Sequence, residues 1–526
     1  MVKVTNLTFG FPKKDLYNEV CFEIVDGEHA VLIGSNGTGK STLIELLLDR
    51  EKYVYDGKIE IDSLARIGFV SQYVSHTGIG SVYDFLAEPF TELLTRADEE
   101  ALKLAEADDM ETAYESYQRL LDEIDSIDGY NFDSNIRKQV SLAGLSKIID
   151  NDINQISGGE YKLLSILKQM LLKPQLLIMD EPDVFLDFEN LVSLSKLINS
   201  YEGTLLVVTH NRLLLGQCFD KILHLENTEL QEFPGTFAEY NLSMLETKTL
   251  MKEQASKDEE WIEIQEKLVE RLRYQATMIA SSKRGAQVHA RASYLERLKA
   301  RKASNPFLED RSFDLHFSEA EVNPEEVAFE LNDYNLAFDR KLLENVSFKI
   351  HEGEKVALVG PNGTGKSSLL NDVVSMLKTS ENSIGYFSQI YDSDEMLSGG
   401  EQNISQLKAL AKLDTKLLIL DEPTSHLDTY AQIALEDAIR EYHGTVFMVT
   451  HDFYTVANCV DRILLIEDGT IKEMSARAFR KSIYKKYFSS DIFEKEKEQK
   501  DLELRINNLL KKGNYKEAKA ILGLED

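Results

Sequence analysis

Two glycine-rich segments of the sequence carry the residue types that bind nucleotide phosphates. They read GSNGTGKS at residues 34–41 and GPNGTGKS at residues 360–367, and both fit the pattern G-x-x-x-x-G-K-S. In this pattern the glycines let backbone N–H groups converge on phosphate oxygens at the start of a helix, and the lysine reaches the β- and γ-phosphates. Each loop therefore predicts a site for the phosphates of a nucleotide and for Mg²⁺. The predicted ATP contacts are Gly34, Ser35, Asn36, Gly37, Thr38, Gly39, Lys40, Ser41, Thr42, Gly360, Pro361, Asn362, Gly363, Thr364, Gly365, Lys366, Ser367 and Ser368.

An Asp-Glu pair follows an apolar run downstream of each loop. The runs are LLIM before Asp180 and LLIL before Asp421. A strand that ends at the edge of a sheet delivers such an aspartate to the metal, together with the serine of the loop. The next residue is placed to polarise an attacking water, so Glu181 and Glu422 are the predicted general bases. The magnesium ligands predicted from these motifs are Ser41, Asp180, Ser367 and Asp421.

The motifs recur along the chain at regular spacing. SGGE occurs at residues 157 and 398, the Asp-Glu pairs start at 180 and 421, and a Thr-His pair ends at 210 and 451, so all three recur 241 residues apart. The phosphate loops are 326 residues apart. A constant offset indicates two copies of one domain, of which the second is 85 residues shorter. Most of the loss falls in an acidic, helix-patterned stretch at about 79–156, which predicts a helical subdomain in the first copy that the second copy has largely lost.

Apolar runs and helix-patterned segments alternate in both copies. AVLIG and VALVG precede the two loops, while STLIELLL and SSLLNDVV follow them. This alternation predicts an α/β fold with a mainly parallel sheet in each copy. Together with the two loops it gives two tandem P-loop domains, joined by a segment whose pattern indicates a long helical hairpin. The predicted boundaries are 1–240 for the first domain, 241–306 for the linker, 307–488 for the second domain and 489–526 for a charged helical tail.

Composition narrows the class of protein further. The 526 residues carry a net charge of −31, and we find no run of 18 apolar residues and no secretory signal at the start. The three cysteines, Cys21, Cys218 and Cys459, are widely spaced. They argue against a disulfide scaffold or a zinc site and fit a reducing environment. We therefore expect a cytoplasmic protein without a membrane span.

The order phosphate loop, SGGE, apolar run, Asp-Glu resembles the ATP-binding cassette (ABC) ATPases. The resemblance implies that Ser157, Gly158 and Gly159 contact the ATP held by the other cassette, and that Ser398, Gly399 and Gly400 do the reverse. The two cassettes of one monomer then pair head to tail, and hydrolysis couples to their opening and closing. The further roles that it implies are magnesium and water contacts for Gln72 and Gln389, switch histidines at His210 and His451, and D-loop aspartates at Asp187 and Asp428.

Two details of the cassettes stay open at this point. The family stacks adenine on an aromatic residue upstream of the loop, for which Phe11 and Phe338 are the candidates, with Phe9 and Tyr17 as alternatives in the first copy. The second copy has the family's usual PTSHLD, whereas the first has PDVFLD, with Asp183 where threonine is usual. This departure puts equal hydrolysis at the two sites in question.

The linker between the copies has an unusual charge. Residues 271–302 hold nine basic residues and one acidic residue in a chain that is otherwise strongly acidic. Such a run predicts a polyanionic partner, although a solvated helix face is the alternative. Tyr274, His289 and Tyr294 lie among these residues and could stack on bases of unpaired RNA. The predicted RNA contacts are Arg271, Arg273, Lys283, Arg284, Arg291, Arg297, Lys299 and Arg301.

Two tandem cassettes with a charged helical linker and no membrane span resemble the ABC-F proteins. The resemblance implies that the linker enters the ribosomal E site and acts on the P-site tRNA and the peptidyl transferase centre, with the ribosome (rRNA and tRNA) as partner. Met278 and Ile279 at the expected tip could contact RNA, displace a small molecule or pack the hairpin's own helices. The shortened second copy and the PDVFLD segment resemble the branch that protects ribosomes against antibiotics; a housekeeping translation factor is the alternative.

Two other classes of ABC ATPase fit the sequence less well. A transporter subunit needs coupling surfaces on both helical subdomains, and the second copy has almost none. DNA-repair ATPases of this kind carry zinc modules or long coiled coils, and three scattered cysteines cannot supply the former. The charged tail from residue 494 onward could contact the ribosome or pack on a cassette.

Overall fold

The computed structural model forms two compact units. It describes residues 1–62, 65–72, 78–106, 110–184, 186–278, 288–296, 315–318, 321–338, 341–377, 384–388, 399–487 and 490–524. The first unit comprises Met1–Thr236 and Arg311–Tyr487 and so contains both copies of the repeat, while the second comprises Phe237–Asp310 and Phe488–Asp526. No described helix combines the length and the apolar character that a bilayer crossing requires.

A six-stranded sheet forms the centre of the first copy. Its strand order is β5-β6-β7-β3-β8-β9, with β9 antiparallel to β8 and the other neighbouring pairs parallel. The strand before the phosphate loop, β3, therefore lies between β7 and β8, and the predicted α/β class is confirmed. The strands are β3 (His29–Ile33), β5 (Ile67–Val70), β6 (Leu176–Asp180), β7 (Thr204–Val208), β8 (Lys221–Glu226) and β9 (Glu229–Pro234).

A smaller antiparallel sheet packs on the central one through a shared core. It consists of β1 (Val2–Phe11), β2 (Lys14–Ile24) and β4 (Asp56–Ile61) in the order β2-β1-β4. Val4 of β1, Leu47 and Ile178 of β6 are buried in one hydrophobic cluster, which joins the two sheets around the helix that follows the loop. The helices of this copy outside its helical subdomain are α1 (Lys40–Leu48), α5 (Gly158–Leu171), α6 (Phe188–Ser200) and α7 (Arg212–Gln217).

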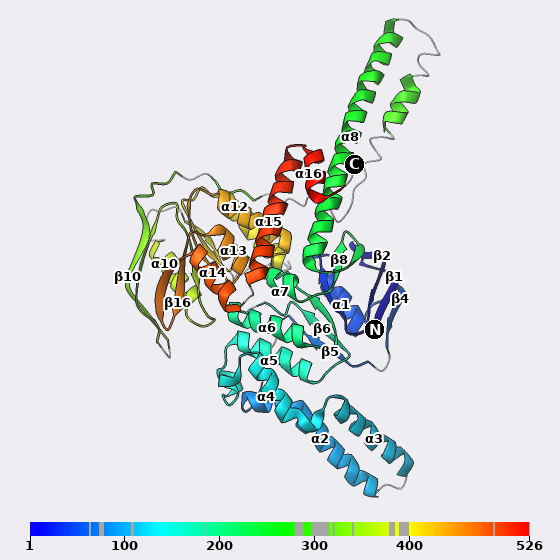
Figure 1. Ribbon diagram of the computed structural model, residues 1–526, viewed down its shortest axis with the longest axis vertical. Coiled ribbons are helices and arrows are strands. Elements are labelled where there is room, and N and C mark those ends of the chain that lie inside the picture. The colour runs from blue at the N-terminus through cyan, green and yellow to red at the C-terminus, as the bar shows by residue number, and fades with distance from the viewer. Residues whose placement is uncertain are drawn as a thin grey trace. The chain divides into compact units, whose positions relative to one another are not determined.

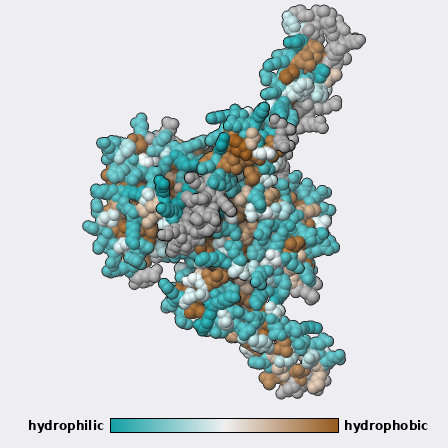
Figure 2. Space-filling view, viewed as in Figure 1, coloured by the Kyte–Doolittle hydropathy of each residue, from teal (hydrophilic) through white to brown (hydrophobic). Residues whose placement is uncertain are grey.

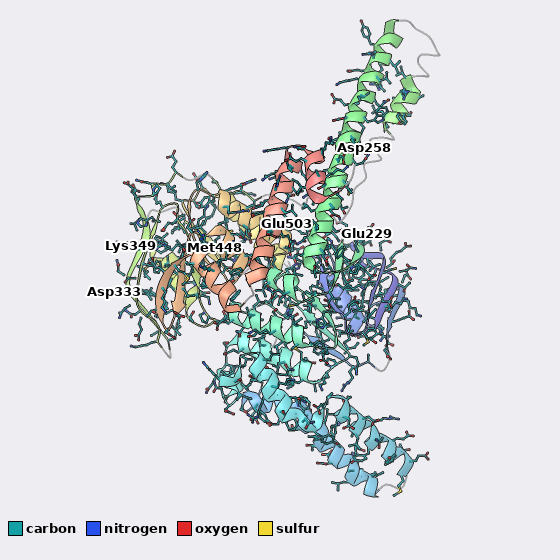
Figure 3. The ribbon with its side chains drawn as sticks, in the orientation of Figure 1. Glu229, Asp258, Asp333, Lys349, Met448 and Glu503 are labelled. Atoms are coloured by element: carbon teal, nitrogen blue, oxygen red, sulfur yellow. The ribbon has the colours of Figure 1, made fainter. Side chains whose placement is uncertain are left out.

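The second copy repeats this topology. Its sheet has the order β13-β14-β15-β12-β16-β17, which matches the first copy strand for strand. Figure 3 labels Met448, which is fully buried in β15, and Asp333 and Lys349 on the β10-β11 hairpin. The elements are β10 (Val327–Ala337), β11 (Lys341–His351), β12 (Lys355–Val359), α10 (Lys366–Leu377), β13 (Ile384–Phe387), α11 (Gly399–Ala411), β14 (Leu417–Asp421), α12 (Thr429–Glu441), β15 (Thr445–Val449), α13 (Phe453–Cys459), β16 (Arg462–Glu467), β17 (Thr470–Ser475) and α14 (Ala476–Tyr487).

Helices occupy the stretch of the first copy for which a helical subdomain was predicted. They are α2 (Val82–Glu106), α3 (Met110–Ser126) and α4 (Phe132–Leu142), and α2 and α3 lie side by side (Figure 1). Ala97, Leu120 and Ile124 form a small core between those two helices. In the second copy only residues 389–398, which lie outside the described part of the chain, separate β13 and its following serine from α11.

The second unit is helical. Helix α8 (Phe237–Met278) has 42 residues, so it is about 63 Å long, and residues 288–296 form a further helical segment. The tail helices α15 (Ser490–Lys511) and α16 (Tyr515–Leu522) lie beside α8 (Figure 1). Leu245 of α8 is buried with Ile506, Leu510 and Ala518 of the tail. Within this unit the tail packs on the linker helix, a partner that neither sequence-based alternative included.

Candidate active sites

The first phosphate loop connects β3 to α1 and has the conformation that its glycines allow. Gly37 and Gly39 have φ values of +76° and +102°, and a Cβ atom on Gly39 would lie 2.9 Å from the Tyr17 hydroxyl oxygen. Lys40 is buried, and its Nζ donates to the carbonyls of Gly34 (2.8 Å) and Ser35 (3.0 Å). Burial lowers the pKa of Lys40. A buried ammonium whose hydrogen bonds within the described part of the chain go to carbonyls fits the phosphates of ATP as its counter-charge.

The second phosphate loop repeats this geometry between β12 and α10. Lys366 Nζ donates to the carbonyls of Gly360 (2.9 Å) and Pro361 (2.8 Å). Gly365 has a φ of +90°, and a Cβ atom there would lie 2.6 Å from a side-chain carbon of Leu336. Ser367 Oγ donates to Asp421 Oδ1 at 3.2 Å. The predicted lysine, serine and aspartate therefore meet at one point, as a Mg²⁺–phosphate group requires.

The two Asp-Glu pairs end β6 and β14, beside the loops. In the first copy Ser41 hydrogen-bonds to Asp180, and burial, followed by the charge of Glu181, raises the pKa of Asp180 to about 6. Glu181 and Glu422 have φ values of +46° and +49°, a left-handed conformation that non-glycine residues rarely adopt. Such strain concentrates at functional sites, and here it turns each glutamate out of line with its strand. A sequence cannot reveal this turn, because neither residue is a glycine.

Of the predicted switch histidines, His210 is buried and His451 is half-buried beside Glu422. His451 Nε2 lies 3.4 Å from Glu422 Oε1, and the His451 backbone N–H donates to Glu422 Oε2 at 3.2 Å. Burial lowers the pKa of His451 to about 3 and that of His210 well below its usual value, so both rings are neutral. His210 Nε2 is buried without a hydrogen-bond partner in the described residues, which suits a ring that binds a phosphate group.

Each D-loop aspartate connects the two copies. Asp428 Oδ2 accepts a hydrogen bond from the backbone N–H of Asn36 at 3.3 Å, and Asp187 Oδ2 accepts one from the backbone N–H of Asn362 at 3.1 Å. The other oxygen of each aspartate caps its own helix, at Ala431 for Asp428 and at the corresponding residue of α6 for Asp187. Each phosphate loop is therefore held by the other copy, in the head-to-tail arrangement that the resemblance implies.

A cavity of about 610 Å³ lies between the first copy's SGGE segment and the second copy's phosphate loop. Gly158 and Gly159, which begin α5, face this cavity, while Ser157 caps the helix by accepting from the backbone N–H of Glu160. The positive end of α5 therefore points at the place where the pattern puts ATP phosphates. The predicted site residues that line the cavity are Gly158, Gly159, Glu181, His210, Asn362, Gly363, Gly365, Lys366, Ser367, Ser368, Glu422 and His451.

The reciprocal site combines the first loop with the start of α11. A Cβ atom on Gly400 would lie 2.0 Å from Asn36 Nδ2, so this glycine is in close contact with the first loop. Gln72 follows β5, and its Nε2 donates to Glu181 Oε2 at 2.5 Å. Two predicted residues of the second copy, Gln389 and Ser398, lie outside the described residues.

The aromatic candidates for adenine stacking differ in exposure. Phe11 is 43% exposed and Phe338 is 68% exposed, each at the turn of an antiparallel hairpin. Phe9 and Tyr17 are buried in the core, and the Tyr17 hydroxyl donates to the Gly39 carbonyl from behind the loop. Of the first-copy candidates, Phe11 is the one whose ring is available to a ligand.

The Asp183 substitution has a structural counterpart that the sequence did not reveal. Asp183 Oδ1 accepts from Thr209 Oγ1 at 2.6 Å, and burial raises the pKa of Asp183 to about 6. Lys162 provides a nearby positive charge, and its Nζ donates to the carbonyls of Ser71 (2.7 Å) and Gln72 (2.6 Å). The departure from the usual threonine therefore comes with a lysine that holds the backbone of the Gln72 loop.

The predicted RNA contacts are only partly described. Arg271 and Arg273 lie near the end of α8, and Arg291 lies in the segment 288–296, where its Nη1 donates to Gln265 Oε1 at 3.4 Å. The other five, Lys283, Arg284, Arg297, Lys299 and Arg301, lie outside the described residues, as does Ile279. The roles of all these residues, and of the site residues above, stay predictions.

The fold and the two loop–carboxylate sites define a class, the ABC-type ATPases with two cassettes in one chain. The sequence model of the ABC transporter family matches residues 17–184 and 343–395. The protein is accordingly an ATP hydrolase that uses ATP with Mg²⁺.

The chain is also similar to individual proteins, one of which is named as a member of the ABC transporter F family. It is 27% identical to the uncharacterized ABC transporter ATP-binding protein YfmM of Bacillus subtilis, over 86% of this chain and 96% of that protein. It is 26% identical to ABC transporter F family member 5 of Arabidopsis thaliana, over 90% of this chain and 76% of that protein. The archaeal ribosome recycling factor aABCE1, solved with the ribosomal stalk protein aP1, has the same fold, with a TM-score of 0.54 and 17% identity over 91% of this chain and 92% of that one.

Proposed function

We propose that the protein is a cytoplasmic, ribosome-associated ATPase whose linker enters the E site and acts on the P-site tRNA and the peptidyl transferase centre. The observation that carries the proposal is the concentration of nine basic residues against one acidic residue at 271–302, in a chain of net charge −31. Clusters of lysine and arginine bind the phosphate backbones of nucleic acids, and ribosomal RNA presents such a backbone.

The linker has the shape that this role needs. Arg271 lies 34 residues along α8 from Phe237, so about 50 Å of helix separates the basic end from the start of α8. The tail helices pack near that start, where Leu245 is buried and Glu253 pairs with Lys519 at 3.4 Å. Beyond this braced part, α8 exposes large side chains, among them Trp261, on a surface that is mostly hydrophilic (Figure 2). The tail therefore supports α8 near its start, and the basic residues near its other end can reach a narrow site in RNA.

The finer function that we propose is protection of ribosomes against antibiotics that act at the peptidyl transferase centre. It is supported by the shortened second copy and by the PDVFLD segment, through the resemblance stated above. A housekeeping translation factor of the same kind is the alternative outcome of the tests below. An archaeal protein of the same fold is named a ribosome recycling factor, so this fold occurs in a protein that is named for a role at the ribosome.

The first test traps the ATP-bound protein. Replacing both general bases, Glu181→Gln and Glu422→Gln, should leave ATP bound and unhydrolysed, and the protein should then co-sediment with ribosomes in the presence of ATP. The wild type should co-sediment far less, because hydrolysis releases it. A double variant that sediments free of ribosomes with ATP, at modest salt, would rule out ribosome association.

The second test reverses charge on the linker. Arg271→Glu, Arg273→Glu and Arg291→Glu, added to the trapped protein, should abolish co-sedimentation and leave ATP binding intact. The matched control reverses three exposed lysines of the cassettes, Lys52, Lys58 and Lys349, to glutamate. Equal loss in both triple variants would mean that net charge, and not the linker, drives binding.

The third test separates protection from a housekeeping role. Cells that express the wild type should tolerate higher concentrations of a peptidyl-transferase inhibitor than cells that express the trapped variant. Unchanged susceptibility to every such inhibitor, with ribosome binding intact, would favour the housekeeping role.

A further inference from the structure

The predicted general base of the first site has a neighbour from the other copy. His426 lies in the loop between β14 and α12 of the second copy, and its Nδ1 is 3.4 Å from Gln72 Nε2 and 3.7 Å from Glu181 Oε2. The same Gln72 nitrogen donates to Glu181 Oε2 at 2.5 Å. The three side chains therefore form one compact cluster across the boundary between the copies, and His426 and Glu181 are 17% and 18% exposed.

The chemistry of the amide indicates what the histidine does there. A glutamine side chain has two N–H donors on its nitrogen and an acceptor oxygen opposite them. An unprotonated Nδ1 is an acceptor, so His426 and the Glu181 carboxylate can take one donor each from Gln72 Nε2. With both acceptors on one side, the amide oxygen of Gln72 is turned away from Glu181. A flipped amide would place its oxygen against the carboxylate and lose both hydrogen bonds.

The backbone of His426 is held in place by the first copy. Its φ is +59°, a left-handed conformation that is unfavourable for a non-glycine residue. The His426 carbonyl accepts a hydrogen bond from Asn36 Nδ2 at 2.8 Å, and Asp428 accepts one from the Asn36 backbone at 3.3 Å. Strained residues that persist because their surroundings hold them cluster at functional sites. Specific hydrogen bonds therefore hold His426 against the first phosphate loop, and the contact does not result from loose packing of a surface side chain.

We propose that His426 is a positioning residue of the first active site, supplied by the second copy. It fixes the Gln72 amide and, through that amide, the Glu181 carboxylate in the orientation that a general base needs. The inference rests on ATP hydrolysis and on the predicted role of Glu181. The first site is then complete only when the second copy is seated on it, which links pairing of the copies to hydrolysis.

The second site cannot be completed in the same way. The position of the first copy that matches His426 is Phe185, which lies outside the described residues. A phenyl ring has no nitrogen acceptor, so it cannot fix an amide as an imidazole does. Control of a general base by the partner copy's D-loop is thus a property of the first site.

The decisive variant is His426→Phe, which introduces the residue type of the matching position. His426→Asn is its matched control, because the asparagine side-chain oxygen restores an acceptor close to the place of Nδ1. Both are made in the full chain with Glu422→Gln, so that only the first site hydrolyses. We expect phenylalanine to lower kcat about tenfold to a hundredfold, with KM for ATP within about threefold, and asparagine to recover most of the rate.

Thermal unfolding without nucleotide gives a readout that does not depend on turnover. A double-mutant cycle combines His426→Phe with Gln72→Leu, and each single variant removes the same hydrogen bond. We therefore expect the fall in Tm of the double variant to be smaller than the two single falls added together. Fully additive falls would show that the two side chains do not interact, and the proposal would fail.

Two further outcomes are decisive. The first is an equal loss of rate in the phenylalanine and asparagine variants. The second is that His426→Phe lowers the rate equally in a Glu181→Gln background, where only the second site hydrolyses ATP. Either outcome would show a general structural role and overturn the proposal. If His426→Phe does not fold, His426→Ala replaces it, because alanine removes the ring without adding bulk. Failure of the general-base assignment is recognised separately, since Glu181→Gln would then leave first-site hydrolysis intact.

Discussion

The two active sites share a backbone but hold their carboxylates differently. In the first site Glu181 accepts a hydrogen bond from Gln72 and lies beside His426 of the other copy. In the second site Glu422 accepts a hydrogen bond from the backbone of His451, which belongs to its own copy. Both copies keep the strands that deliver the glutamates, whereas the hydrogen bonds that hold the glutamates differ among the residues that the structure describes. A shared backbone structure therefore does not imply that the two sites hydrolyse ATP at equal rates.

The phosphate loops show the same divergence. In the first loop the backbone N–H and the hydroxyl of Ser35 both donate to Glu226 Oε2, at 3.1 and 2.8 Å, and this anchors the loop to the end of β8. The second loop has Pro361 at this position, which has no N–H to donate. The first phosphate loop is therefore anchored by a side-chain contact that the motif itself does not require.

The largest expected effect comes from replacing the general bases one at a time. Glu181→Gln and Glu422→Gln together should lower ATP hydrolysis by about a hundredfold or more, the range for loss of a general base. Each single variant should remove one site's share of turnover, which steady-state phosphate release measures. Unequal single effects would sharpen the comparison, whereas a double variant with near wild-type turnover would contradict the assignment of both bases.

The next effect concerns a buried ion pair that a residue of the first copy forms with the second copy. The matching residue of the second copy does not form the reciprocal pair. Arg212, two residues after the first switch histidine, donates to Asp452 Oδ2 at 2.9 Å and to Glu436. Burial alone would lower the pKa of Arg212, but the two carboxylates outweigh it and raise the pKa. The matching residue of the second copy is Phe453, which cannot form this pair.

Replacing that arginine should therefore destabilise the pairing of the copies. Arg212→Met leaves two carboxylates without their buried partner, and we expect a loss of about 3–5 kcal/mol in the free energy of unfolding, measured with urea. Lys58→Met, which removes an exposed ion pair with Glu60, is the control and should change stability by less than about 1 kcal/mol. A loss for Arg212→Met no larger than for the control would show that the pair contributes little.

A smaller effect is expected at the loop anchor. Ser35→Ala removes the hydroxyl that donates to Glu226, whose carboxylate is buried, and should cost about 1–2 kcal/mol. Isothermal titration with a non-hydrolysable ATP analogue should then show weaker binding at one of two sites. The matched change in the other loop, Pro361→Ala, should leave both affinities within about threefold. Weaker binding in both variants would argue against an anchor specific to the first loop.

The smallest effect is a pH dependence of stability from Asp183. Burial raises the pKa of this carboxyl to about 6, so the folded state favours its neutral form. Its contribution to stability is fully present below about pH 4, where the unfolded carboxyl is protonated as well, and is lost as the pH rises from there through 6. Asp183→Asn, which is neutral at every pH, should raise the free energy of unfolding relative to the wild type at pH 8, by about 1 kcal/mol or more, and change it little below about pH 4. The opposite order, with the benefit at the acidic pH, would contradict a raised pKa.

Much of the cassette fold was predictable because its signals are local and occur twice. The apolar runs before and after each loop become β3, β6, β12 and β14, and the acidic stretch of the first copy becomes helices α2 to α4. The tail was not predictable, since an amphipathic helix shows that one face is buried but does not name its partner. Ile506 and Leu510 of the tail pack with Leu245 of α8, which is more than 250 residues away in the chain.

The amino-acid sequence by itself determined the two phosphate loops, the carboxylates beside them, the duplication and the charge of the linker. Each of these depends on residues close together in the chain, where spacing alone sets the chemistry. Only the tertiary structure decided that Glu181 turns out of its strand, that Lys162 holds the Gln72 loop and that His426 reaches the first site from the other copy. These contacts join residues from 90 to 354 positions apart, and such distant pairs meet only when the packing of whole sheets brings them together.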